Sequence, residues 1–320
     1  AVTVAVGALT GPFDRRGRLV VAVAVVALPW LAVKYVPVAG ALVALALLDR
    51  WRKGRRREAA ILVGGLAVAG LAFVVFHRIV YGGWTVYASG DHFSETGEAS
   101  VIGVDPDYLG RSQRLLGLLV DRSFGLVTWA PVFLFAAVAV GALARRRPAG
   151  WTALLLPAAA GWATATWVAL TMHGWWWPGR QVVVVVPLLV VATAWWLDRH
   201  RRAVTPFVVA AVLGALSWAW VVIEVLQRRL RLIIDFDATR NPWMRALRPA
   251  LPDFRQPGTR TGLLAAAWAV AVVGLAVAGW WSERGSGAGG RRGQHEDAGA
   301  GEAAEADVAA LDLDREGAVG

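Results

Sequence analysis

The sequence predicts an all-α, polytopic membrane protein with about eight transmembrane helices and extracytoplasmic loops. Long apolar runs alternate with short arginine clusters over residues 1–282, and hydrophobic residues make up 57% of the chain. The mean hydropathy of +0.51 lies outside the range that is usual for soluble globular proteins. Continuous apolar runs favour helices over the alternating strands of a membrane barrel.

Most of the predicted helices come from runs that are long enough to cross about 30 Å of hydrocarbon. These runs are residues 59–80, 124–144, 150–172, 203–226 and 261–281. Another helix is expected over 181–197, because this apolar run also ends on an arginine cluster.

The first two helices are predicted to form a hairpin. The apolar stretch that contains them is too long for one crossing and short for two. Pro29 and Pro37 divide it, so we expect two short helices over 19–33 and 37–49. Lys34 then stands at the turn between them.

The two ends of the chain differ from this pattern. Residues 1–12 are apolar, and we expect them to be the frayed end of an earlier helix, with an N-terminal part of a longer protein before Ala1. Residues 283–320 hold nine acids and four arginines among Gly and Ala. Such a segment buries too little apolar surface to fold, so we expect a disordered acidic tail after the membrane domain 1–282.

The arginine clusters predict the orientation. They lie at 15–18, 50–57, 145–147 and 199–202 and hold 15 lysines and arginines, against five in the alternate loops. Since basic residues favour the cytoplasmic side, we expect a multi-pass protein of the cell membrane with both termini in the cytoplasm. Arginine in place of lysine, with abundant Ala, Gly and Val, is typical of a high-GC bacterial genome.

The loop 227–260 departs from this rule. It must lie outside, yet it carries eight arginines against three aspartates. Two interpretations stay open: an amphipathic segment that lies on lipid headgroups, or a site for a lipid phosphate or pyrophosphate.

Several classes of function are disfavoured. The chain has no cysteine and five scattered histidines, so we expect no metal site and no cofactor. The interiors of the predicted helices hold almost no Asp, Glu or Lys, which argues against a proton- or sodium-coupled transporter. No predicted helix carries a polar stripe along its length, which argues against a channel. The sequence shows no basic soluble domain with interleaved aromatic residues, so we do not expect nucleic-acid binding. Membrane lipids are the expected partners.

Polar side chains that suit a lipid-phosphate substrate gather on the predicted outer face. Cations there suit a phosphate, acids suit base catalysis and aromatic rings suit a sugar. The candidate substrate-binding residues are Lys34, Asp121, Arg122, His173, Trp176 and Arg180. Structural alternatives stay open: an ion pair for the adjacent Asp121 and Arg122, a turn position for Lys34, and contact with lipid headgroups for Arg180.

Three segments that contain these residues resemble membrane glycosyltransferases of the GT-C type. More narrowly, they are similar to the bacterial group that resembles the dolichyl-phosphate-mannose–protein mannosyltransferases. The segments are ALPWLAVKYVPVAGALVALAL, LLGLLVDRSFGLVTWAPVFLFA and WWWPGRQVVVVVPLLVV. The PALPDF of residues 249–254 is similar to the loop before that group's last helix. Gln181 stands where the group has an aromatic residue, and a valine replaces the first proline of the last motif.

The resemblance implies a polyprenyl-phosphate-linked sugar as donor, an active face outside the cytoplasm and an inverting transfer with an acidic base. In that group the catalytic acid precedes the lysine-bearing hairpin, so the resemblance implies that this chain is the C-terminal portion of a cell-envelope enzyme. Two alternatives stay open: a non-catalytic or truncated membrane protein that binds lipid phosphate, and a transporter. The sequence predicts neither the sugar, the acceptor nor the oligomeric state.

Overall fold

A computed structural model of the protein describes residues 1–84, 88, 107–169, 172, 178–230 and 238–284. These residues form helices, turns and connecting segments, with no strand among them, which confirms the all-α class. Three helical segments in this part of the chain are long and apolar enough to cross a membrane: Arg56–Tyr81, Arg201–Leu226 and Thr259–Ser282. The predicted disordered tail lies outside the described residues, apart from Glu283 and Arg284.

The predicted hairpin is present. α2 (Arg15–Leu31) and α3 (Val36–Arg52) are joined by the 3-10 turn η1 (Val33–Tyr35), with Pro37 in the first turn of α3. Both helices are longer than predicted, because each extends into the neighbouring arginine cluster. α4 (Arg56–Tyr81) follows and ends on a left-handed glycine, Gly82.

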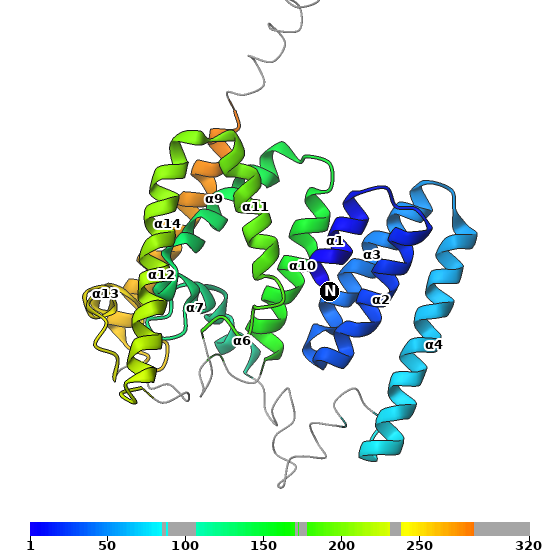
Figure 1. The fold of residues 1–320 in the computed structure, drawn as a ribbon, viewed down its shortest axis with the longest axis horizontal. Coiled ribbons are helices and arrows are strands. Elements are labelled where there is room, and N and C mark those ends of the chain that lie inside the picture. Colours follow the sequence, from blue (N-terminus) through cyan, green and yellow to red (C-terminus); the bar gives the residue numbers. More distant parts are fainter. Residues whose placement is uncertain (85–87, 89–106, 170–171, 173–177, 231–237, 285–320) are drawn as a thin grey trace, which may run out of the picture.

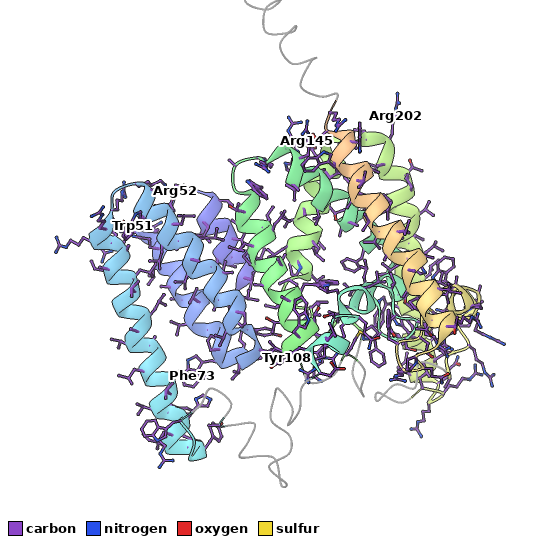
Figure 2. The ribbon with its side chains drawn as sticks, turned by 180° about the vertical axis from the view of Figure 1, so that it is seen from behind. Trp51, Arg52, Phe73, Tyr108, Arg145 and Arg202 are labelled. Atoms are coloured by element: carbon purple, nitrogen blue, oxygen red, sulfur yellow. The ribbon has the colours of Figure 1, made fainter. Side chains whose placement is uncertain are left out.

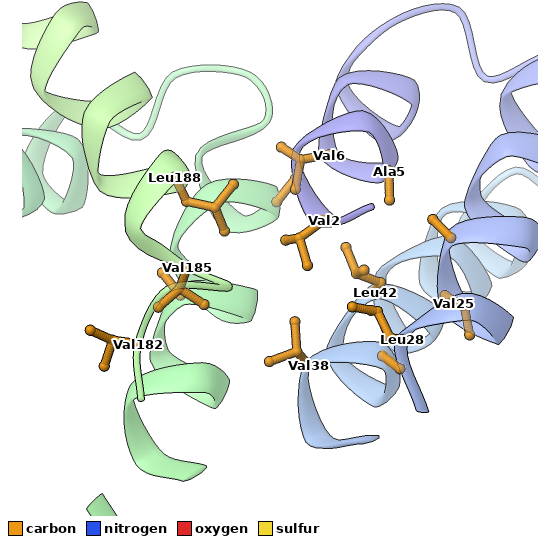
Figure 3. Packing of buried hydrophobic residues seen from close by; sticks show 14 of the residues in the cluster. Val2, Ala5, Val6, Val25, Leu28, Val38, Leu42, Val182, Val185 and Leu188 are labelled. Carbon is orange, nitrogen blue, oxygen red and sulfur yellow. The ribbon is translucent and has the colours of Figure 1, made fainter. Parts of the chain in front are cut away.

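The apolar start of the chain is a packed helix rather than a frayed end. α1 (Val2–Thr10) buries Val2, Ala5 and Val6 against α2 and α3. Figure 3 shows these side chains between the α2–α3 hairpin and the segment that leads into α11. α1 is therefore part of the largest hydrophobic core.

The predicted helix 124–144 is broken. α8 (Leu126–Trp129) and α9 (Leu134–Arg146) are separated at Ala130 and by the 3-10 turn η2 (Pro131–Phe133). The proline at the start of η2 cannot donate a backbone hydrogen bond, which explains the break. Two short helices precede it, α6 (Tyr108–Arg111) and α7 (Arg114–Val120).

Two further predicted helices are shorter than expected. α10 (Trp151–Ala163) passes into a π-helical turn, η3 (Thr164–Val168), in place of one helix over 150–172. α11 (Val186–Arg199) starts five residues later than predicted, because Pro187 favours the first turn of a helix and residues 178–185 form turns.

The remaining elements complete the fold. η4 (Arg201–Ala203) leads into α12 (Val204–Leu226), and α13 (Pro242–Leu247), η6 (Arg248–Ala250) and α14 (Thr259–Ser282) follow. α14 packs along α9 at very close range. A Cβ on Gly141 would lie 1.8 Å from the carbonyl oxygen of Ala276, and one on Gly279 would lie 1.9 Å from that of Val138. Only glycine permits this approach.

The helices give the body two distinct ends (Figure 1). Arg52, Arg145 and Arg202, from three different clusters, lie at one end, and Tyr108 lies at the other (Figure 2). Arg18 pairs with Glu58, which brings the fourth cluster to the same place. We call this the arginine-cluster end. The opposite end, with η1, η3 and α6, is the Lys34 end.

Candidate functional site

Lys34 lies in the η1 turn, half-buried between the two helices of the hairpin. Its amine donates a 3.0 Å hydrogen bond to the side-chain oxygen of Gln181, which joins the turn to the segment before α11. Burial lowers the pKa of Lys34, and the positive charge of Arg180 lowers it further. Burial raises the pKa of the neighbouring Tyr35, against the effect of Arg180. Two of the six candidate residues, Lys34 and Arg180, thus lie close enough for their like charges to repel each other.

Arg180 is exposed at the mouth of an apolar cavity of about 450 Å³, which we call the Arg180 groove. Its apolar lining comes from α8, η2, the turn before α11, the first turn of α11, and α12. The lining includes Leu126, Trp129, Phe133, Val183, Pro187 and Trp218. The rings of Trp129 and Trp218 are 5.6 Å apart and form part of one wall.

The left-handed Gly179 sets the position of Arg180. Its φ is +78°, and a Cβ there would lie 2.7 Å from the side chain of Leu126. A larger residue would therefore push the turn away from the groove. The arrangement places one guanidinium beside an apolar channel, which suits an amphiphile with an anionic head.

Two arginines that sequence reasoning did not single out lie at the same end. Arg111 donates to the carbonyl oxygen of Trp167 and Arg114 to that of Ala169, each at 2.7 Å. These acceptors belong to or follow η3, where the π-helical turn changes the hydrogen-bond partners of the backbone. Burial lowers the pKa of Arg114, and the charge of Arg111 adds to this effect. They form a second pair of like charges, and η3 also contacts η1.

Asp121 stabilises the turn before α8 through hydrogen bonds to the backbone. Its side chain is fully buried and accepts hydrogen bonds from the backbone N–H groups of Ser123, Phe124 and Phe254 at 2.9, 2.8 and 3.2 Å. Its carbonyl oxygen accepts from the hydroxyl of Thr128. Asp121 therefore fixes the turn that leads into α8, and with it one wall of the Arg180 groove.

Arg122 belongs to a different cavity. Its guanidinium pairs with Asp253 at 3.2 Å, and its backbone N–H donates to the carbonyl oxygen of Pro252. This cavity also measures about 450 Å³ and shares no lining residue with the Arg180 groove. The predicted site thus divides between two places, because Arg180 lines one cavity and Arg122 lines the other.

His173 and Trp176 lie outside the described residues, so their place in the predicted site stays a prediction. Within the described ranges, no three His, Asp or Glu side chains lie close enough together to hold a metal ion. Comparison with protein-family models, with curated proteins and with solved structures finds no match to this chain.

Proposed function

We propose that the chain is a multi-pass membrane protein whose roughly eight helices place the arginine clusters on the cytoplasmic side, with both termini in the cytoplasm. Four clusters gather at one end of the helical body. Large apolar side chains on the outermost helices are exposed, among them Val68 at 69%, Leu216 at 61% and Val270 at 74%. Apolar side chains exposed in this way suit a lipid environment, and their contact with water would cost free energy.

We further propose that the Lys34 end binds a polyprenyl-phosphate-linked sugar and acts in glycosyl transfer outside the cytoplasm. One observation carries this proposal: Arg180, with Lys34 nearby, lies at the mouth of an apolar groove. The groove suits the first isoprene units, and the two cations suit the phosphate. The resemblance of the segments around Lys34 and Arg180 to GT-C glycosyltransferases supports the same assignment.

The two cations suit the chemistry of such a transfer. In the transfer, the oxygen of an acceptor hydroxyl forms a bond to C1 of the sugar and its proton passes to a general base, while the bond between C1 and the phosphate oxygen breaks. The electron pair of the broken bond stays on the phosphate, whose charge changes from about −1 to about −2. Lys34 and Arg180 would stabilise this increase in negative charge at the leaving group. The proposal assigns them this role and assigns the general base to no described residue.

The second candidate is a membrane protein that binds lipid phosphate without catalysis. The same groove and cations favour it equally, and it needs no catalytic acid. Transfer of sugar, rather than binding of the lipid, separates the two candidates.

Binding of a polyprenyl phosphate to the full chain in phosphatidylcholine nanodiscs tests the shared claim. We expect Arg180→Ala to weaken binding about 30-fold, because a charge-assisted hydrogen bond contributes about 2 kcal/mol. The matched control is Arg201→Ala, since Arg201 is 80% exposed and pairs with Asp198 at the arginine-cluster end. Equal affinities for the two variants would contradict the proposal.

A second assay then follows discharge of a radiolabelled polyprenyl-phosphate sugar onto membrane acceptors. Discharge that depends on Arg180 supports the transferase. Tight binding without discharge supports the non-catalytic alternative.

A further inference from the structure

A second polar cavity, which we call the Arg248 pocket, lies where the loop before α14 meets the turn after α7. It measures about 450 Å³, and three arginines from distant parts of the chain line it: Arg122, Arg248 and Arg260. Asp253, Gln256, Thr259 and Thr261 supply its other polar groups.

The pocket is held in shape by hydrogen bonds that join these distant segments. The guanidinium of Arg260 donates to the carbonyl oxygen of Pro249 at 3.0 Å, which ties α14 to η6. The hydroxyl of Thr261 donates to the carbonyl oxygens of Asp253 and Gln256. The bond from the N–H of Arg122 to Pro252 adds the third segment. The guanidinium of Arg260 and the backbone of Arg122 are therefore held in place before any ligand binds.

The charge of the pocket favours an anion. Among the described lining residues there are three arginines and one carboxylate, that of Asp253, which pairs with Arg122 at 3.2 Å. α14 also begins here, at Thr259, and the preceding N-cap residue, Gly258, supplies no side-chain cap. The positive end of a helix dipole adds to the attraction for an anion that the arginines already provide.

The Arg248 pocket lies at the Lys34 end of the helical body, opposite the arginine-cluster end. Glu283, at the far end of α14, pairs with Arg146 at 2.9 Å and so lies at the arginine-cluster end. The first turn of α14 then lies at the opposite end of the body, the same end as Lys34. Arg248 and Arg260 belong to the loop whose excess of arginine departs from the charge rule for membrane proteins.

We propose that the Arg248 pocket binds a phosphate group, supplied either by the headgroup of an anionic membrane lipid or by free phosphate. The planar forks of the arginines match phosphate oxygens in pairs. This site goes beyond the proposed donor site, because it shares no lining residue with the Arg180 groove. It gives the arginines of the 227–260 loop a ligand of their own.

The experiment uses the full chain with Arg180→Ala as the background, so that the donor site adds no phosphate binding. One arm measures radiolabelled inorganic phosphate bound in phosphatidylcholine nanodiscs. The other arm uses nanodiscs that contain phosphatidylglycerol and measures the lipid retained by native mass spectrometry. Both arms compare Arg248→Gln with Arg202→Gln, an exposed arginine at the other end.

We expect Arg248→Gln to weaken binding about 10-fold and Arg202→Gln to leave it unchanged. Asp253→Asn provides a variant of opposite sign: it removes the carboxylate that pairs with Arg122 and should strengthen binding, which a misfolded protein would not do. Binding in the first arm alone identifies free phosphate, and binding in the second alone identifies the headgroup. Binding that responds to neither Arg248→Gln nor Asp253→Asn in either arm would overturn the proposal.

Discussion

At the arginine-cluster end, positive charges are paired with carboxylates. Arg18 and Arg50 both contact Glu58, Arg50 also contacts Asp49, and Arg146 pairs with Glu283 at 2.9 Å. At the Lys34 end, in contrast, positive charges lie close enough to act on one another. Burial lowers the pKa of Lys34 and the charge of Arg180 lowers it further; burial and then the charge of Arg111 do the same to the pKa of Arg114.

The charged side chains at the two ends therefore contribute differently to the free energy of the protein. A cation that is paired with a carboxylate contributes to the folded protein itself. A cation that lies beside another cation raises the free energy of the protein, and an anion that binds between them relieves the repulsion. We therefore expect an anionic ligand to stabilise the Lys34 end, and the following predictions test this contrast.

The largest expected effect concerns the helices that hold the two ends together. Gly141→Ala places a Cβ 1.8 Å from a backbone oxygen of α14, so the helices must move apart. We expect a loss of about 3 kcal/mol in the free energy of unfolding, measured by thermal unfolding in detergent. Gly274→Ala, where a Cβ meets nothing within 4 Å, is the control. If both variants are equally stable, α9 and α14 are not packed as described.

A pair of substitutions compares the two ends directly. Arg50 is 2% exposed, contacts Asp49 and Glu58, and lies over the ring of Phe13. We expect Arg50→Gln to lower the free energy of unfolding by about 2 kcal/mol. Lys34→Gln should leave it unchanged within about 0.5 kcal/mol while weakening the binding of polyprenyl phosphate. A large loss of stability from Lys34→Gln would show that Lys34 is a structural cation like Arg50.

Two aspartates give a smaller contrast. Asp121 is buried and accepts three backbone N–H groups, whereas Asp14 accepts one, from Gly17, at the start of α2. Asp121→Asn should destabilise the protein by about 1.5 kcal/mol, because an amide nitrogen cannot accept from a backbone N–H. Asp14→Asn should be nearly neutral, since asparagine caps a helix as well as aspartate does. Thermal unfolding of both variants measures the difference, and equal losses would place Asp121 outside the buried turn.

The smallest expected effect is a pH dependence from Lys34. Its pKa is lowered from 10.5 in the folded, unliganded protein, so between the lowered value and 10.5 the unfolded chain binds more protons. The free energy of unfolding should therefore rise with pH in this window. Phosphate favours the protonated lysine, so affinity should fall, by about threefold, as pH rises through the lowered pKa. Binding curves should be flatter in Lys34→Gln, and an identical curve would remove Lys34 from the site.

Local sequence signals predicted the helical class, the α2–α3 hairpin and the position of Lys34 in its turn. Prolines and arginine clusters mark these features within a few residues of where they lie. The same signals do not predict the break between α8 and α9, because Pro131 stands inside a continuous apolar run. They also missed the π-helical turn after α10, which has no composition that distinguishes it from the helix before it.

The candidate site was predictable only in part. The sequence predicts Lys34 and Arg180 as cations of one face, but the hydrogen bond from Lys34 to Gln181, next to Arg180, joins residues 147 positions apart and depends on tertiary packing. Arg122 was grouped with them because it follows Asp121, yet the turn after α7 directs it to Asp253. Arg111 and Arg114 were overlooked because their acceptors are backbone carbonyls, which no residue pattern reveals.

We propose above all that the first isoprene units of the polyprenyl donor lie in the Arg180 groove. A larger apolar groove of about 760 Å³ lies between α2, α3 and α4, and it provides the competing site. The most direct measurement is photocrosslinking of the full chain with a polyprenyl phosphate that carries a diazirine in its first isoprene units, followed by peptide mapping. If the donor lies in the Arg180 groove, we expect crosslinks at Leu126, Phe133, Val183 or Trp218. These crosslinks should be lost in Arg180→Ala. Crosslinks confined to α2, α3 and α4 would contradict it.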